Sequence, residues 1–97
     1  MKKFMFLYYG EFNTASQEMK DAWGQWFADN AKRFVDSGNP FGPGKEITLN
    51  GTRDLSEDSI PMTGYSMINA ESLEEAQRIA ETCPVISSVR VYEAMSM

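Results

Sequence analysis

The sequence predicts an α+β fold in which four strands and two helices follow one another as strand, helix, strand, strand, helix and strand. Three observations support this order: the chain opens with an aromatic strand pattern, two helical patterns each follow a capping signal, and turn residues separate the remaining strands. The 97 residues contain no linker and no shift in composition, so we expect one domain spanning residues 1–97.

The first strand is predicted at residues 3–9, where both alternating faces are apolar or aromatic. One face carries Phe4, Phe6 and Tyr8, and the other carries Met5, Leu7 and Tyr9. Because neither face is suited to water, we expect both faces of this strand to be covered in the folded protein.

The first helix is predicted at residues 15–37. Thr14 and Gln17 have the spacing of a capping box, and apolar residues then recur at helical spacing until Gly38. The next segment, residues 39–44, contains two prolines and two glycines, which fix turns and remove hydrogen-bond donors. We therefore expect a structured loop after the helix.

The middle of the chain is predicted to hold the second and third strands. Residues 45–50 alternate polar and apolar side chains, which is typical of a half-exposed strand at the edge of a sheet, and Asn50-Gly51 begins a turn. The polar residues 52–59 are expected to form a loop, and residues 62–68 the third strand.

The second helix is predicted to begin at another capping box, formed by Ser72 and Glu75, and to end at Pro84, before a last strand at residues 86–94. This order indicates a ferredoxin-like βαββαβ sandwich, with both helices on one face of an antiparallel four-stranded sheet. The apolar open face of that sheet predicts a symmetric homodimer, in which the two sheets face one another. A monomer with a few exposed aromatic side chains is the alternative.

The composition limits the class of partner. A net charge of −5 with scattered Lys and Arg residues argues against nucleic acid and against an anionic membrane surface. The apolar start of the chain ends at Gly10-Glu11, too soon for a signal peptide, and no stretch is long enough to span a membrane. One cysteine and no histidine favour a cytoplasmic location and predict neither a metal site nor a cofactor.

Five segments resemble the YCII-related family, and together they extend over nearly the whole chain. They are the opening strand with its glycine, the glycine and proline turn, the core of the third strand, and the entry and exit of the second helix, at residues 4–10, 38–44, 64–65, 70–76 and 83–84. The resemblance implies a ferredoxin-like fold that dimerises as an α/β barrel.

Some members of that family carry a His and Asp pair thought to act as acid and base, with the His on the first helix and the Asp near its end. Asp36 is similar to the acidic position, whereas the histidine has no counterpart in residues 23–26, Trp-Gly-Gln-Trp. Asp36 is therefore the candidate catalytic residue. The dipole disfavours a carboxylate in the last turn of a helix, so Asp36 requires either solvent or a role there.

Aromatic residues are expected to converge between the first helix and the sheet, where they would line a pocket for a flat apolar ligand. The candidate ligand-binding residues are Tyr9, Trp23, Phe27, Phe41, Tyr65 and Arg90. The alternative for the aromatic residues is simple burial in the core, and for Arg90 it is a pairing with a nearby carboxylate. Cys83 is not expected to be a nucleophile, because it follows a helix C-terminus and no histidine activates it.

Three functions are compatible with these features. The first is a small-molecule binder without catalytic activity, supported by the aromatic set and the missing histidine. The second is a cofactor-independent enzyme of isomerase, lyase or monooxygenase-like type that acts on an aromatic or lactone-like substrate, with Asp36 as base and a tyrosine or Arg90 stabilising negative charge. The third is a structural or partner-binding dimer whose pocket is filled by its own side chains.

Overall fold

The computed structural model describes residues 1–11, 15–55, 60–84 and 87–97. In chain order, its elements are β1 (Lys2–Tyr9), α1 (Gln17–Asp29), the 3₁₀ turn η2 (Ala31–Arg33), β2 (Phe34–Asp36), β3 (Lys45–Thr48), β4 (Gly51–Asp54), β5 (Met62–Ala70), α2 (Leu73–Glu81) and β6 (Ser88–Ala94). The protein is thus an α+β protein with two α-helices, as predicted.

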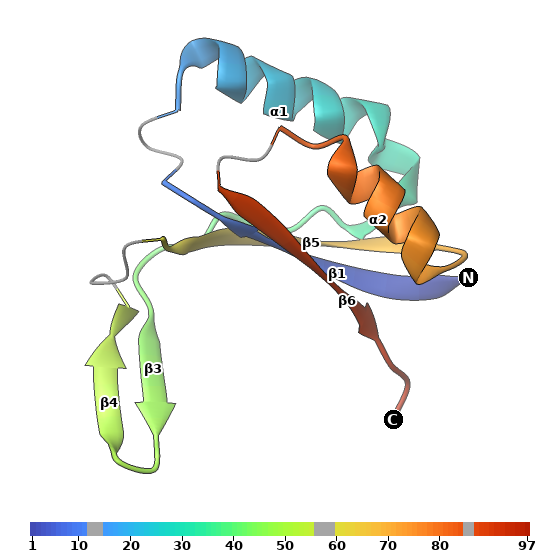
Figure 1. Cartoon of the computed structure of the whole chain (residues 1–97). Coiled ribbons are helices and arrows are strands. Elements are labelled where there is room, and N and C mark those ends of the chain that lie inside the picture. Colours follow the sequence, from blue (N-terminus) through green and yellow to red (C-terminus); the bar gives the residue numbers. More distant parts are fainter. Residues whose placement is uncertain (12–14, 56–59, 85–86) are drawn as a thin grey trace.

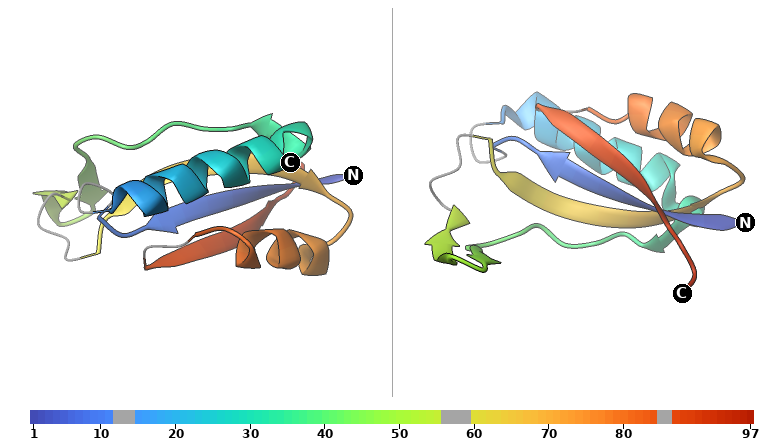
Figure 2. Two further views of the ribbon diagram at one scale, coloured as in Figure 1. Left: turned by 90° about the horizontal axis from the view of Figure 1, so that it is seen from above. Right: turned by 60° about the horizontal axis from the view of Figure 1, so that its bottom comes forward.

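Four strands form the main sheet, in the spatial order β2-β5-β1-β6, and each neighbouring pair is antiparallel. Both helices lie on the same side of this sheet (Figures 1 and 2). This arrangement is compatible with the predicted ferredoxin-like fold. It leaves the opposite face of the sheet without a helix.

The core lies between the helices and the sheet, and the alternation in β1 determines which side chains enter it. Phe4 and Phe6 are fully buried, whereas Met5 and Leu7 on the other face are half-buried. On β5, Ile68 stands opposite Phe4 and is also fully buried. β1 carries apolar side chains on both faces, as predicted. Within the single chain, however, only one of these faces is covered.

The predicted first helix at residues 15–37 is too long. α1 begins after Ser16, whose hydroxyl accepts a hydrogen bond from the backbone N–H of Met19, and Thr14 of the predicted cap lies outside the described residues. The helix ends at Asp29, where the side chain of Asn30 donates to the Trp26 carbonyl and helps to close the last turn. The chain then turns and forms β2, which pairs with β5.

The predicted edge strand at residues 45–50 is not part of the main sheet, because β2 occupies that edge. Residues 45–54 form a separate hairpin of β3 and β4 that extends away from the body of the molecule (Figure 1). Opposite charges face each other across it, in the ion pairs Lys45 with Asp54 and Glu46 with Arg53. These local pairs stabilise the hairpin without the sheet. The predicted loop at 52–59 is therefore a strand over its first residues.

The second half of the chain agrees closely with the prediction. The Ser72 hydroxyl accepts from the backbone N–H of Glu75, so α2 begins at the predicted cap, although the Glu75 carboxylate accepts from the N–H of Glu71. The helix ends at Glu81, before Pro84. β5 extends two residues beyond the predicted 62–68, and β6 lies within the predicted 86–94, whose first residue is outside the described part.

No helix among the described residues has both the length and the hydropathy needed to cross a bilayer.

Candidate functional site

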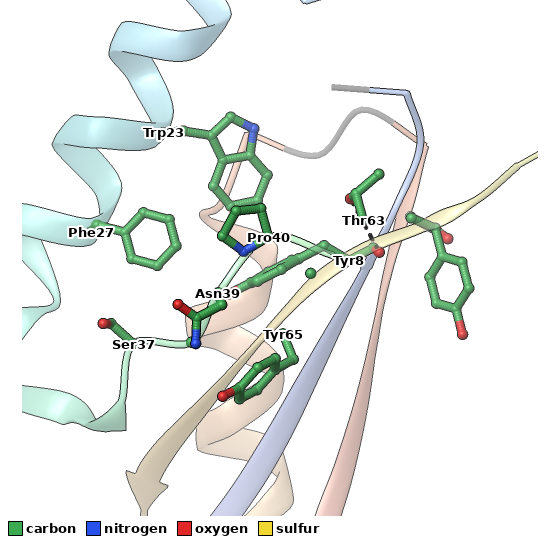
Figure 3. Close-up of a pocket in the computed structure, with 12 residues that line it drawn as sticks. Tyr8, Trp23, Phe27, Ser37, Asn39, Pro40, Thr63 and Tyr65 are labelled. Carbon is green, nitrogen blue, oxygen red and sulfur yellow. Dashed lines mark hydrogen bonds between the residues drawn. The ribbon is translucent and has the colours of Figure 1, made fainter. Parts of the chain in front are cut away.

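A cavity of about 460 Å³ lies at one end of the layer between α1 and the sheet (Figure 3). α1, the end of β1, the start of β5 and the segment at residues 37–40 contribute most of its wall. The lining residues are Tyr8, Tyr9, Trp23, Phe27, Ser37, Gly38, Asn39, Pro40, Thr63, Gly64, Tyr65 and Ser88. The volume is within the range of small-molecule sites, which are typically a few hundred Å³.

Aromatic rings form the wall beneath α1. Trp23 and Phe27 are four residues apart, so they share one face of the helix, with ring centroids 5.9 Å apart. The edge of Tyr8 meets Trp23 at 5.1 Å and an interplanar angle of 77°. Trp26 contacts Trp23 from the next turn at 5.8 Å. These contacts fix the orientation of the Trp23 ring.

The indole nitrogen of Trp23 is buried and has no hydrogen-bond partner among the described residues. The side chain is only 8% exposed, and Figure 3 shows its nitrogen edge turned away from Phe27. Trp26 provides the contrast, because its indole N–H donates to the Thr82 hydroxyl at 2.9 Å. Buried donors in proteins are generally paired, so the Trp23 nitrogen is an exception among the described residues.

The hydroxyl of Tyr8 is already used inside the protein. It donates to the Ser66 hydroxyl at 2.9 Å, and Ser66 donates in turn to the Ser37 carbonyl at 2.6 Å. Burial raises the pKa of Tyr8 above its ordinary value, and the hydrogen bond to Ser66 opposes that shift only in part. Tyr8 is therefore a neutral, structural part of the wall that ties the segment after β2 to the sheet.

The segment at residues 37–40 closes the side of the cavity along the β5 edge. It continues the pairing of β2 through a bridge between Pro40 and Gly64, and the Phe41 N–H donates to the Thr63 carbonyl at 2.8 Å. Gly38 has a φ of +87°, and a Cβ there would lie 1.6 Å from the Tyr65 carbonyl oxygen. Only glycine fits at that position, so the closeness of this segment to β5 depends on it.

Asp36 lies at the end of β2, so its predicted place in the last turn of a helix is wrong. One carboxylate oxygen accepts from the Tyr65 hydroxyl at 3.0 Å, and the other accepts from the Gly38 N–H at 2.9 Å. The side chain is exposed and does not line the cavity, although Tyr65 does. Its catalytic role stays a prediction.

The candidate ligand-binding residues divide into two groups. Tyr9, Trp23, Phe27 and Tyr65 line the cavity. Phe41 stacks on Tyr65 at 5.6 Å but is 44% exposed and lies outside the lining, as does Arg90.

Arg90 does not pair with a carboxylate among the described residues. Its guanidinium lies over the ring of Tyr9, 4.8 Å from the centroid, in a cation–π contact on the open face of the sheet.

The candidates predicted from the sequence do not include most of the polar residues that line the cavity, namely Ser37, Asn39, Thr63 and Ser88. Tyr8 and Pro40 are also absent from the predicted candidates. A signal for Pro40 was present, because the sequence predicts a structured loop at residues 39–44. No signal separates Tyr8 from the core residues Phe4 and Phe6, which share its face.

Cys83 is buried, and burial raises the pKa of its thiol to about 11. The thiol is therefore protonated at neutral pH, which agrees with the expectation that Cys83 is not a nucleophile. Burial, and not the helix end named in the prediction, is the cause. Within the described residues no three His, Cys, Asp or Glu side chains gather as metal ligands would.

The fold and cavity define an α+β protein with two helices on one face of an antiparallel sheet and an aromatic cavity between α1 and that sheet. Comparison with protein-family models and with curated proteins finds no match. The resemblance to the YCII-related family therefore stays a prediction that rests on the quoted segments.

Proposed function

We propose that the protein binds a small, flat organic molecule in the cavity beneath α1, without a cofactor. The observation that carries this proposal is a cavity of about 460 Å³ whose walls are largely aromatic. Large buried aromatic side chains normally fill such space with each other. Here the aromatic side chains border an open cavity instead, and ligand sites are usually lined in this way.

Blocking the cavity tests this proposal. Ser88 lines the cavity and is exposed, so Ser88→Phe adds bulk at its mouth, whereas Ser87→Phe adds the same bulk next to it at a residue that does not line it. A thermal-shift screen of flat organic compounds should find ligands that stabilise the wild type and Ser87→Phe, but not Ser88→Phe. Ligands that stabilise all three proteins equally bind elsewhere and would contradict the proposal.

The resemblance and the open sheet face support a homodimer. Met5, Leu7 and Met67 lie half-buried on the face that no helix covers, and Tyr92 on the same face is 54% exposed. A second copy would cover this apolar surface under a two-fold axis. Light scattering should give a dimer mass for the wild type and a monomer mass for Leu7→Glu, with Gln25→Glu on the outer face of α1 as control. A monomeric wild type would rule the dimer out.

One observation favours an enzyme as the second candidate. Tyr65 lines the cavity and donates its hydroxyl proton to Asp36. Because Tyr65 stands opposite Leu7 on β1, its side chain projects from the face of the sheet that no helix covers. A substrate that reaches the Tyr65 oxygen from that face could pass it a proton while the tyrosine proton moves to Asp36, which acts as the base. Asp36→Asn should abolish turnover of such a substrate while its affinity is retained. Turnover that survives Asp36→Asn would remove this candidate.

A further inference from the structure

We propose that a second copy of the chain docks on the face of the sheet that no helix covers, with Asp36 of each copy paired to Arg90 of the other. This inference rests on the homodimer in the proposed function and adds the two residues that set its geometry. It follows from the positions of the charges on this face and from their contacts within the chain.

The two charges lie on the two outer strands of the uncovered face. Asp36 on β2 stands opposite Met67, so it projects from that face at one edge of the sheet. Arg90 on β6 stands opposite Leu7 and projects from the same face at the other edge. The middle strands between these edges carry apolar and aromatic side chains, namely Met5, Leu7, Tyr65 and Met67. The face is therefore mostly apolar, with a negative charge at one edge and a positive charge at the other.

The two charges do not meet within one chain. β2 and β6 are three strand spacings apart in the sheet, which is about 14 Å. Arg90 lies over the ring of Tyr9 and makes no ion pair with a described residue. Asp36 accepts from the Tyr65 hydroxyl and the Gly38 N–H, and its two oxygens have further lone pairs that can accept. Both charged side chains are exposed, so each can take a partner from another chain.

A second copy brings the opposite charges together. Two identical sheets that face one another can be related by a two-fold axis in the plane between them. When this axis runs along the strands, between β5 and β1, the β2 edge of each copy lies over the β6 edge of the other. Asp36 then faces the partner's Arg90, twice in each dimer, across the roughly 10 Å that separate stacked sheets. The strands of the two sheets stay aligned, which is a common way for sheets to pack face to face.

The two charges also lie at matching levels along the strands. The Asp36 carboxylate binds the Tyr65 hydroxyl, Tyr65 stands opposite Leu7, and Leu7 stands opposite Arg90. Rotation about an axis parallel to the strands keeps the level of every residue, so Asp36 and the partner's Arg90 meet without a shift. Lys3 is the remaining charge on the described strands of this face, and at its level the partner's Asn69 offers a neutral amide.

An axis across the strands is the alternative arrangement of the same two faces. It would lay β6 over the partner's β6, so that Arg90 faces the partner's Arg90 and Asp36 faces the partner's Asp36. Like charges placed against each other weaken an interface. The charges on this face therefore favour the axis along the strands.

The test reverses one of the two charges. Arg90→Asp should raise the dissociation constant of the dimer at least about tenfold in analytical ultracentrifugation, because Asp36 then faces a carboxylate twice in each dimer. The matched control is Arg78→Asp, which makes the same change of net charge at an exposed residue of α2, on the other side of the sheet. It should leave the dissociation constant within about twofold of the wild type, since exposed charges farther away than a Debye length are screened.

Mixing two variants tests the pairing directly. Asp36→Arg alone should weaken the dimer as Arg90→Asp does, because two guanidinium groups then face each other. A mixture of the two variants should form a heterodimer with an affinity close to that of the wild type, because each chain again meets the opposite charge at both positions. Native mass spectrometry separates this heterodimer from the two homodimers by mass. Weak homodimers with no recovery in the mixture would contradict the pairing.

The outcomes separate this inference from the homodimer itself. A wild type that is monomeric removes the homodimer, and the inference with it. A dimer that Leu7→Glu dissociates but Arg90→Asp leaves unchanged keeps the uncovered face as the interface and overturns the pairing. That result is also the one expected for an axis across the strands, where the substitution only replaces one pair of like charges with another. The reading of Arg90→Asp does not depend on the folding of Asp36→Arg.

Discussion

The two ends of the layer beneath α1 are built from the same kind of side chain but are packed differently. At the closed end, Trp26 meets Phe34 and Phe6, and its N–H is bonded to Thr82. At the other end, Trp23 borders a cavity and its N–H is unpaired within the described residues. The helix therefore carries two tryptophans one turn apart, of which Trp26 packs in the core and Trp23 also borders the cavity.

The largest expected effect comes from truncating the closed end. Trp26→Ala removes a ring that is packed on several sides and also leaves Thr82 without its donor, so it should lower the free energy of unfolding by about 3–5 kcal/mol. Trp23→Ala should cost at least about 1 kcal/mol less, because it removes a ring that borders a void and a donor that is already unsatisfied. Urea denaturation measures both, and equal losses would contradict the difference between the two ends.

The next effect concerns the segment that closes the cavity. Gly38→Ala places a methyl group against the Tyr65 carbonyl and strains a positive φ, so it should destabilise the protein by about 2–3 kcal/mol. Gly42→Ala is the matched control, since a Cβ at residue 42 would meet nothing within 4 Å, and it should have little effect. Thermal unfolding compares the two. A stable Gly38→Ala protein would show that this segment does not need its close contact with β5.

Alkaline pH tests whether the side chains of Tyr8 and Cys83 are buried. Tyr8 and Cys83 are neutral when protonated, and burial raises both pKa values, that of Cys83 from 9.0 to about 11. As pH rises above about 9, the unfolded chain releases these protons before the folded protein does, so stability present at lower pH is lost. Urea midpoints should therefore fall between pH 9 and 11, and Cys83→Ala should reduce the fall. A midpoint independent of pH in this window would show that these groups are accessible to water.

The smallest effect is expected far from both ends, in the hairpin. Glu46→Gln breaks an ion pair with Arg53 whose side chains are about half exposed, so it should change stability by less than about 0.5 kcal/mol. It should also leave binding in the cavity unchanged. A larger loss, again measured in urea, would show that the hairpin is coupled to the body of the protein.

The sequence predicts the parts of the fold that local physics determines. The alternation of β1 correctly separates Phe4 and Phe6 from Met5 and Leu7, and the Ser72 cap correctly starts α2. The end of α1 could not be predicted, because Phe34 satisfies both the helical spacing and a strand that packs under Trp26. The strand pattern of residues 45–50 fits a hairpin as well as a sheet edge, and only tertiary structure decides between them.

The candidate site was predictable only in its aromatic residues. Trp23 and Trp26 have the same helical spacing, and what separates them is Thr82, a residue 56 positions beyond Trp26 whose hydroxyl reaches only one indole. The predicted helix includes Asp36 because it runs past the true end of α1 at Asp29, whereas Asp36 lies on β2. Long-range contacts of this kind leave no pattern in the local sequence.

The central claim is that the cavity beside Trp23 is a ligand site. A crystal structure of the protein soaked with 1-indanone, a flat bicyclic probe, tests it most directly. We predict the bicyclic ring between Trp23 and the segment at residues 37–40. A cavity filled by the protein's own side chains, or a ligand bound only elsewhere, would contradict it and favour a structural or partner-binding dimer.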